Sequence, residues 1–168
     1  MGNEIESIRD MDIRLSLRLF KDQLNSYIIS KDSKDIRELD RLTNLNRNPI
    51  FDTTNRVMYR HDKKSINLIL IKENKNISSK ERARLTKKDH IVPRCVATKY
   101  IFEELIDNPN MSIQEYEEIL MKVGKYAEIT ADEHDLLRIY HKNNNNKYLS
   151  VEEYLNFTHY KELGIVLI

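Results

Sequence analysis

Apolar residues at the N-terminal end of the chain recur every three or four positions, which is the spacing of one helix face. This pattern predicts a helix within residues 4–30, although residues 13–20 alone also alternate like a strand. A second apolar stripe predicts a helix over residues 33–46; it consists of Ile36, Leu39 and Leu42. Two amphipathic helices in succession predict a helical hairpin at the N-terminus.

The middle of the chain changes to extended patterns. Residues 49–61 hold two short apolar runs around a turn-like cluster, and residues 65–72 form a β-branched apolar run that predicts a buried strand. Ser78 with Glu81 three positions later resembles a capping box and predicts the start of a short helix. Residues 89–93 predict a short extended segment, because a proline biases the residue before it towards the β region.

The C-terminal half alternates helical patterns with one short strand. The predicted helices cover residues 96–108, 112–125, 130–140 and 150–164, and the predicted strand covers residues 126–130. Thr130 and Glu133 predict a second capping box. The predicted fold class is therefore α+β and mostly helical. We expect an N-terminal helical part over residues 1–48 and an α+β part over residues 49–168, packed as one compact unit.

Composition narrows the class of protein. No apolar run approaches the roughly 20 residues that cross a bilayer, and the first ten residues lack an apolar signal region. The one cysteine, Cys95, excludes an internal disulfide and a cysteine-based zinc site. Abundant Asn, Lys and Ile favour an AT-rich bacterial or phage genome. We expect a cytoplasmic protein, in a bacterium or a phage-infected host cell, with no membrane partner.

Charge is unevenly distributed although the net charge is only +1. Residues 56–99 carry 13 basic and 4 acidic side chains, whereas residues 100–168 carry 6 basic and 13 acidic ones. The basic centre suits a groove for a phosphate backbone. A lysine-rich solvated surface is the alternative explanation, and charge alone does not separate the two.

The basic region contains an adjacent acid and imidazole, Asp89 and His90. On a strand the two side chains point to opposite faces, which allows one to hold a metal ion while the other acts on the substrate. Imidazole titrates near neutral pH and accepts a proton from water, and a hard divalent cation prefers carboxylate oxygen. An exposed pair with no role is the alternative.

A second predicted strand and a predicted helix with two histidines follow the Asp89-His90 segment in the chain. After a predicted strand, His134 lies in the first turns of a predicted helix, and His141 follows on the same helix face. The segment 89–93 (DHIVP) resembles the first strand of the HNH endonuclease family, and residues 129–137 (ITADEHDLL) resemble its second strand and metal-binding helix. The resemblance covers residues 85–142 and implies a small ββα-metal centre.

The resemblance also implies roles for single residues. Asp89 would match the carboxylate metal ligand, His90 the general base that activates water, and His134 the helix histidine of the metal site. His141 is the substitute ligand if the register differs by two turns. The implied cofactor is one divalent ion, Mg²⁺ or Mn²⁺, and the implied substrate is nucleic acid, with DNA the expected form. The backbone-binding residues would be Arg84, Lys87, Lys88 and Arg94.

Two alternatives from other classes stay open. The chain lacks some positions that HNH proteins fill, and its C-terminal third is acidic. These features also fit a catalytically inactive, phage- or bacteria-encoded protein-binding module, such as an inhibitor of a host defence nuclease, because an acidic surface can mimic DNA. A DNA-binding regulator is the remaining alternative; against it, residues 4–45 carry no basic excess.

Overall fold

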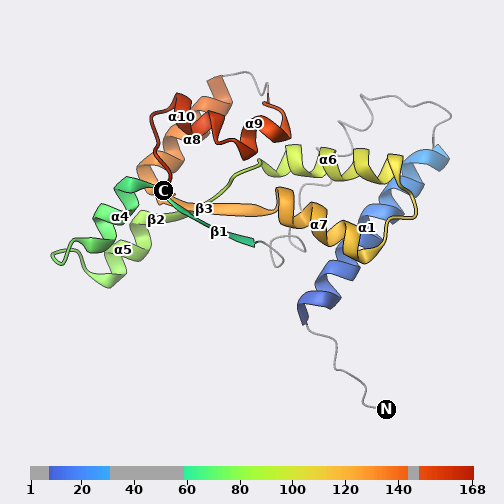
Figure 1. The fold of residues 1–168 in the computed structure, drawn as a ribbon, viewed down its shortest axis with the longest axis horizontal. Helices are drawn as coiled ribbons and strands as arrows, with labels where there is room; N and C mark the ends of the chain where they lie inside the picture. Colours follow the sequence, from blue (N-terminus) through green and yellow to red (C-terminus); the bar gives the residue numbers. More distant parts are fainter. Residues whose placement is uncertain (1–7, 31–58, 144–147) are drawn as a thin grey trace, which may run out of the picture. The chain divides into compact units, whose positions relative to one another are not determined.

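The computed structural model of the chain describes residues 8–30, 59–143 and 148–168 (Figure 1). The helix predicted over residues 33–46 and the runs predicted within 49–58 lie outside these residues. The chain divides into two compact units, each made of two separate segments. Unit 1 holds residues 1–58 and 93–124, and unit 2 holds residues 59–92 and 125–168. The division predicted between residues 48 and 49 lies outside the described residues and stays a prediction.

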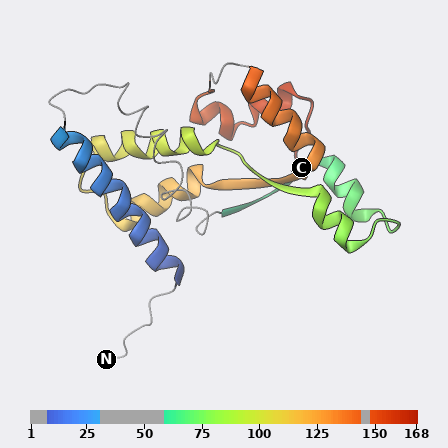
Figure 2. The same cartoon turned by 180° about the vertical axis from the view of Figure 1, so that it is seen from behind.

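Unit 1 is helical in its described part. It contains α1 (Ile8–Ser30), α6 (Arg94–Asp107) and α7 (Ile113–Val123), and α1 packs against both other helices (Figure 2). The helix predicted within residues 4–30 is confirmed, since length and period prevail over the short alternating stretch.

Aromatic rings fill the centre of unit 1. The Phe20 ring meets the Phe102 ring edge-on, with 5.1 Å between their centroids, and lies 6.1 Å from the Tyr116 ring. Ser112 caps α7 in a complete capping box with Glu115. The sequence therefore predicted this helix and its start correctly.

Unit 2 contains a three-stranded mixed sheet. Its strands are β1 (Tyr59–Lys64), β2 (Thr86–His90) and β3 (Lys125–Thr130), in the order β1-β3-β2. The central strand β3 is parallel to β1 and antiparallel to β2. The fold class is thus α+β and mostly helical, as predicted, and the strand predicted over residues 126–130 is confirmed.

The helices of unit 2 lie in two groups in Figure 1. One group is α4 (Ile66–Glu73) with α5 (Ser79–Leu85), and the other is α8 (Ala131–Asn143), α9 (Val151–Leu155) and α10 (Thr158–Glu162). Of these helices, α8 packs against both β2 and β3. Antiparallel strands followed by a helix across them are therefore the local arrangement of residues 86–90 and 125–143.

The strand predicted over residues 65–72 is wrong, because these residues form α4. The Ser65 hydroxyl accepts a hydrogen bond from the Leu68 backbone N–H, which is the contact of a helix N-cap. Leu68 is the buried residue of the helix, and Leu70 is 60% exposed. The periodicity of a short apolar run does not distinguish a strand from a helix. The N-cap contact of Ser65 favours the helix here.

The single helix predicted over residues 150–164 is also wrong. Phe157 adopts a left-handed backbone conformation, with φ 59° and ψ 29°, and separates α9 from α10. The tail after α10 returns to the sheet, where Leu167 forms a bridge with Ser65 and the backbone groups of Lys64 and Ile168 exchange two hydrogen bonds.

The core of unit 2 lies between the sheet and its C-terminal helices. Its buried members are Ile91, Ala127, Ile129, Leu137, Tyr160 and Ile165. Leu137 of α8 belongs to this core, whereas its neighbour Leu136 is 47% exposed. Successive helix residues are 100° apart, and the buried face of α8 passes through Glu133 and Leu137.

None of the helices within residues 8–30, 59–143 and 148–168 combines the length and the apolar character needed to cross a membrane.

Candidate functional site

The pairing of β2 with β3 sets the direction of the Asp-His pair. Asp89 lies opposite Ala127, and His90 lies opposite Tyr126. Side chains alternate between the faces of a sheet, so Asp89 shares the face of buried Ala127 and His90 points to the other face. The opposite orientation predicted for the pair is therefore the one that β2 adopts.

Asp89 is held by a residue from the far end of the chain. The Tyr160 hydroxyl of α10 donates a hydrogen bond to Asp89 Oδ2 at 2.5 Å. Burial raises the pKa of the Asp89 carboxyl above its usual range, while the hydrogen bond from Tyr160 and the charge of His134 act to lower it. Burial, followed by the charge of Asp89, holds the pKa of Tyr160 well above its usual range, so Tyr160 remains the donor.

His134 lies on the first turns of α8, as predicted, and is partly exposed. It is close enough to Asp89 for its charge to act on the Asp89 carboxyl. The helix that carries His134 packs against the strand that carries Asp89.

His90 lies on the opposite face of the sheet and is partly exposed. This face also presents Tyr126, and the Lys88 ammonium lies over its ring, 4.7 Å from the centroid. β2 is an edge strand of the sheet and ends at His90.

Glu133 is a buried carboxylate next to the site, and it organises the start of α8. Its Oε2 accepts hydrogen bonds from the Ser65 hydroxyl at 2.6 Å and from the Thr130 backbone N–H at 2.8 Å. The Asn67 amide donates to Oε1 at 2.9 Å. The capping box predicted from Thr130 and Glu133 is therefore present, and the same carboxylate also ties α8 to the N-terminus of α4.

His141 lies in a separate aromatic cluster. Its ring centroid is 6.2 Å from that of His159 and 6.2 Å from that of Tyr154. Burial lowers the pKa of His141, and burial together with the charge of His141 lowers the pKa of His159 to about 3. The role of substitute metal ligand for His141 stays a prediction.

The predicted backbone-binding residues are distributed over both units. Lys87 and Lys88 are exposed on β2, and Arg84 is exposed at the end of α5. Arg94 begins α6 and belongs to unit 1. Three of the four basic residues therefore lie on the elements that lead to Asp89.

Among residues 8–30, 59–143 and 148–168, no group of three or more His, Cys, Asp or Glu side chains is placed to hold a metal ion. The site for Mg²⁺ or Mn²⁺ that the resemblance implies, with Asp89 and His134 as its ligands, stays a prediction.

Comparisons with known proteins give no match to the chain. No protein-family model, no curated protein and no solved structure is significantly similar to it.

Sequence reasoning missed Tyr160 and the wider role of Glu133. Tyr160 is 71 residues away from Asp89, and its sequence neighbourhood predicted only core contacts. Glu133 was identified through its capping spacing, but its bond to Ser65 depends on a segment predicted to be a strand. A signal for Tyr160 would have been its polar hydroxyl on an otherwise apolar helix face, since buried tyrosine hydroxyls usually find a partner.

Proposed function

We propose that the chain is a metal-dependent, HNH-like endonuclease that hydrolyses phosphodiester bonds. The observation that carries the proposal is the packing of α8, which holds His134, against β2, which holds Asp89. The antiparallel pairing of β2 with β3 and the position of α8 directly after β3 also support the proposal, although α6 and α7 lie between β2 and β3 in the chain.

Each residue of the proposed site has one task. Asp89 and His134 would hold Mg²⁺ or Mn²⁺, which supplies positive charge for the leaving oxygen. A ring nitrogen of His90 takes the proton of the attacking water. Lys87 and Lys88 neutralise phosphates on either side of the scissile bond without contacting bases. Tyr160 keeps the Asp89 carboxylate in one orientation.

The test is cleavage of plasmid DNA in Mg²⁺ or Mn²⁺ by the full chain and by two variants. His90→Ala should lower the cleavage rate by about 10²- to 10⁴-fold, because it removes the general base. Asp89→Asn should lower it to background, because an amide is a poor ligand for a hard cation.

Asp135→Asn is the matched control for the carboxylate. Asp135 is exposed on α8, and its Oδ1 lies 3.7 Å from a guanidinium nitrogen of Arg138. Because Asp135 has no task in the proposed site, its amide variant should cleave at the wild-type rate. Equal rates for wild type and His90→Ala, or no cleavage in any divalent metal, would overturn the proposal.

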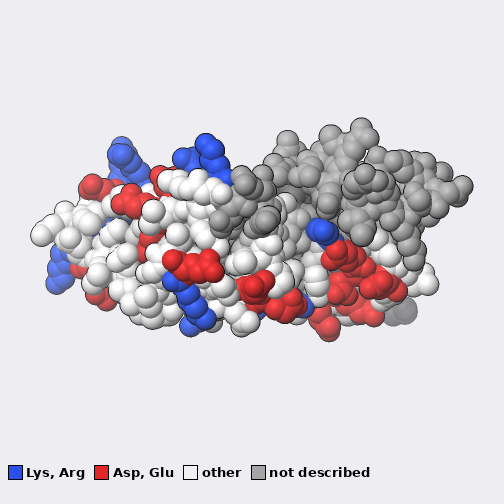
Figure 3. Space-filling view, turned by 90° about the horizontal axis from the view of Figure 1, so that it is seen from above, with Lys and Arg blue, Asp and Glu red and all other residues white. Residues whose placement is uncertain are grey.

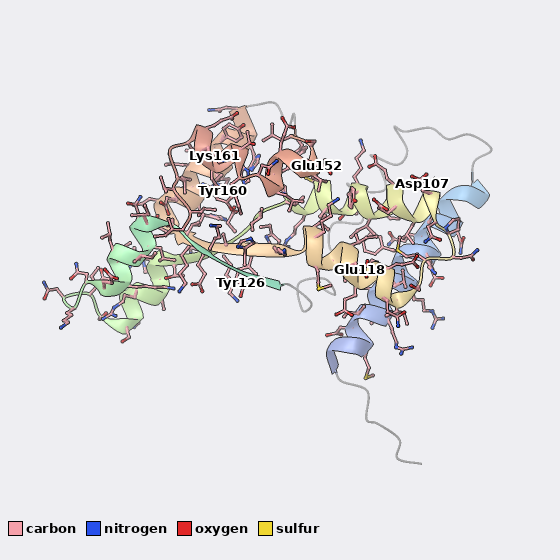
Figure 4. The ribbon with its side chains drawn as sticks, viewed as in Figure 1. Asp107, Glu118, Tyr126, Glu152, Tyr160 and Lys161 are labelled. Carbon is pink, nitrogen blue, oxygen red and sulfur yellow. The ribbon has the colours of Figure 1, made fainter. Side chains whose placement is uncertain are left out.

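A second candidate function is supported by the surface of unit 1. The exposed charged side chains of α6 and α7 are acidic apart from Arg94; they are Glu103, Asp107, Glu115 and Glu118. Figure 4 labels Asp107 and Glu118 on these helices, and Figure 3 shows carboxylates gathered at one end of the described surface. This surface fits a module that binds a basic protein such as a defence nuclease.

Binding measurements separate the two candidates. Wild type should inhibit a purified, basic DNA-cleaving enzyme in a salt-sensitive manner, and Asp107→Lys with Glu118→Lys should not, if the second candidate is correct. Cleavage by the wild type that depends on His90, without such inhibition, supports the nuclease alone.

A further inference from the structure

Unit 2 carries an apolar pocket next to α10. It has a volume of about 460 Å³ and is lined by Lys63, Phe157, Lys161, Gly164, Ile165, Val166 and Leu167. Pockets that bind small molecules typically measure about 300 to 1,000 Å³ and are lined by apolar side chains with a few polar groups. This pocket has that size and that combination, with lysine as the polar component.

Phe157 gives one wall of the pocket a fixed aromatic ring. It follows α9 in the left-handed conformation, a place where glycine is the usual residue because a Cβ disfavours it. The ring is partly buried against the core, with the His61 ring edge-on at 5.5 Å and the Tyr160 ring at 6.1 Å. Strained backbone of this kind is concentrated at functional sites.

The charges of the pocket indicate the chemistry of its ligand. Lys63 on β1 and Lys161 on α10 both line it, and none of its described lining residues is a carboxylate. Aromatic rings combined with cationic side chains are typical of sites that bind single-stranded nucleic acid. In such sites the bases stack on the rings and the phosphates bind the cationic groups. An apolar peptide side chain would need the ring but not the two lysines.

We propose that this pocket binds one unpaired nucleotide of the substrate strand, with its base against the Phe157 ring and its phosphate near Lys63 and Lys161. The inference rests on the proposed nuclease function and names a substrate feature for it. Tyr160 connects the two places, since its ring neighbours Phe157 and its hydroxyl binds Asp89. Figure 4 labels Tyr160 and Lys161 as successive residues of α10.

The experiment measures binding without cleavage. Fluorescence anisotropy in EDTA compares a labelled strand of thymidines with an equally long strand of abasic sites. Phe157→Leu should weaken binding of the thymidine strand about tenfold, because stacking on the ring is lost, and should leave binding of the abasic strand unchanged. Equal effects on the two strands, or no effect on either, would overturn the inference.

Lys161→Gln tests the phosphate contact. It should weaken binding of both strands and reduce the slope of log K against log salt by about 0.7, the value for one phosphate contact on a single strand. Lys142→Gln, at an exposed lysine near the end of α8, is the matched control and should leave the slope unchanged. A slope equally affected by both variants contradicts the proposed contact.

Phe157→Gly separates binding from folding. Glycine adopts the left-handed conformation freely, so relief of strain should offset part of the lost packing, and thermal unfolding should still be cooperative. Its discrimination between thymidine and abasic strands should be lost as in Phe157→Leu. If a fluorescent fatty acid occupies the pocket instead, and Phe157→Leu abolishes that binding without changing strand binding, the nucleotide assignment is wrong.

The outcomes distinguish this inference from the proposed function. Base-dependent binding without cleavage in any metal would support the nucleotide pocket and contradict the nuclease function. Cleavage without base-dependent binding would support the nuclease function and contradict the nucleotide pocket. A wild-type chain that binds neither strand overturns the inference directly.

Discussion

Unit 1 and unit 2 bury different kinds of side chain. In its described part, unit 1 buries aliphatic and aromatic residues around Phe20, and its buried polar residues are the neutral Ser16 and Thr98. Unit 2 buries Glu133 and His159, and it also withdraws the Asp89 carboxyl from water. The described part of unit 1 thus buries no carboxylate or imidazole, whereas the described part of unit 2 buries both.

The difference indicates where chemistry, and not only stability, has shaped the chain. A buried carboxylate destabilises a fold unless hydrogen bonds replace its water, and Glu133 has three such donors. Apolar residues of similar volume would fill the same core without the cost of removing a charge from water. Interior ionisable groups with strongly shifted pKa values are typical of functional sites, which supports placing the proposed function in unit 2.

The largest expected effect is on stability, from Glu133→Ala. We expect the free energy of unfolding to fall by about 4 kcal/mol, because the Ser65 hydroxyl and the Thr130 N–H lose their acceptor in a buried place. Urea denaturation followed by circular dichroism measures the change.

Glu115→Ala is the matched control in unit 1. Glu115 occupies the same capping-box position of α7 but is exposed, so its loss should have a much smaller effect. Equal losses of stability in the two variants would break the comparison between the units.

The next effect concerns pH. Burial and the charge of His141 depress the pKa of His159 to about 3, whereas an unfolded histidine titrates near 6.5. The unfolded state therefore binds more protons, and stability is retained above pH 6.5 and lost as the pH falls towards 3. Relative to His159→Phe, wild type should lose about 3 kcal/mol between pH 7 and pH 4 in urea denaturation.

The residues around His159 determine which other groups contribute to the pH dependence of stability. Its ring packs on those of His141, Tyr154 and Tyr160, and of these His141 is the other group that titrates in the range. The double variant with His141→Phe reports that contribution. Parallel pH curves for wild type and His159→Phe would show that the imidazole is not buried in the folded protein.

A smaller effect is expected on catalysis from Tyr160→Phe. Loss of the hydrogen bond to Asp89 should lower Mn²⁺ affinity or the cleavage rate by about 10- to 100-fold, as changes to residues that orient metal ligands usually do. Mn²⁺ binding by electron paramagnetic resonance provides a measurement independent of cleavage.

Tyr140→Phe is the control, because the Tyr140 hydroxyl also donates to a carboxylate, Glu162, but at an exposed place. It should leave both Mn²⁺ affinity and cleavage at the wild-type level. If the two variants behave alike, Tyr160 has only a structural role.

The smallest effect is expected in unit 1, from Ser16→Ala. Its hydroxyl makes a buried hydrogen bond of 2.6 Å with the Tyr116 hydroxyl. We expect a loss of about 1 kcal/mol in thermal or urea unfolding, since both groups are neutral. Cleavage by the folded variant should equal that of wild type. A loss as large as that of Glu133→Ala would remove the distinction between the two interiors.

The elements that were predictable from the sequence are those with local signals. Ser78, Ser112 and Thr130 mark helix starts through cap spacing, and each accepts the expected backbone hydrogen bond. The alternation of Asp89 and His90 followed from strand geometry alone. The roles of Asp89 and His134 as metal ligands stay a prediction that rests on the resemblance.

The features that were not predictable depend on distant contacts. Ser65 as an N-cap is decided partly by Glu133, which is 68 residues away. The break at Phe157 places a ring against the core in a conformation that sequence patterns assign to glycine. The Tyr160 bond to Asp89 exists only once the C-terminal helices have packed on the sheet.

The hydrogen bond from the Ile91 N–H to the Lys125 carbonyl oxygen, at 3.1 Å, has a consequence for how the chain is assembled. It closes the antiparallel pair at the place where the backbone leaves unit 2 and returns to it, so residues 93–124 amount to a very long hairpin loop for the sheet. Lengthening a loop adds little entropic cost, about 0.6 kcal/mol for each doubling. Helices α6 and α7 are therefore an insertion between the paired strands β2 and β3. A short turn in place of α6 and α7 would leave the register of the two strands and the positions of Asp89 and His134 unchanged.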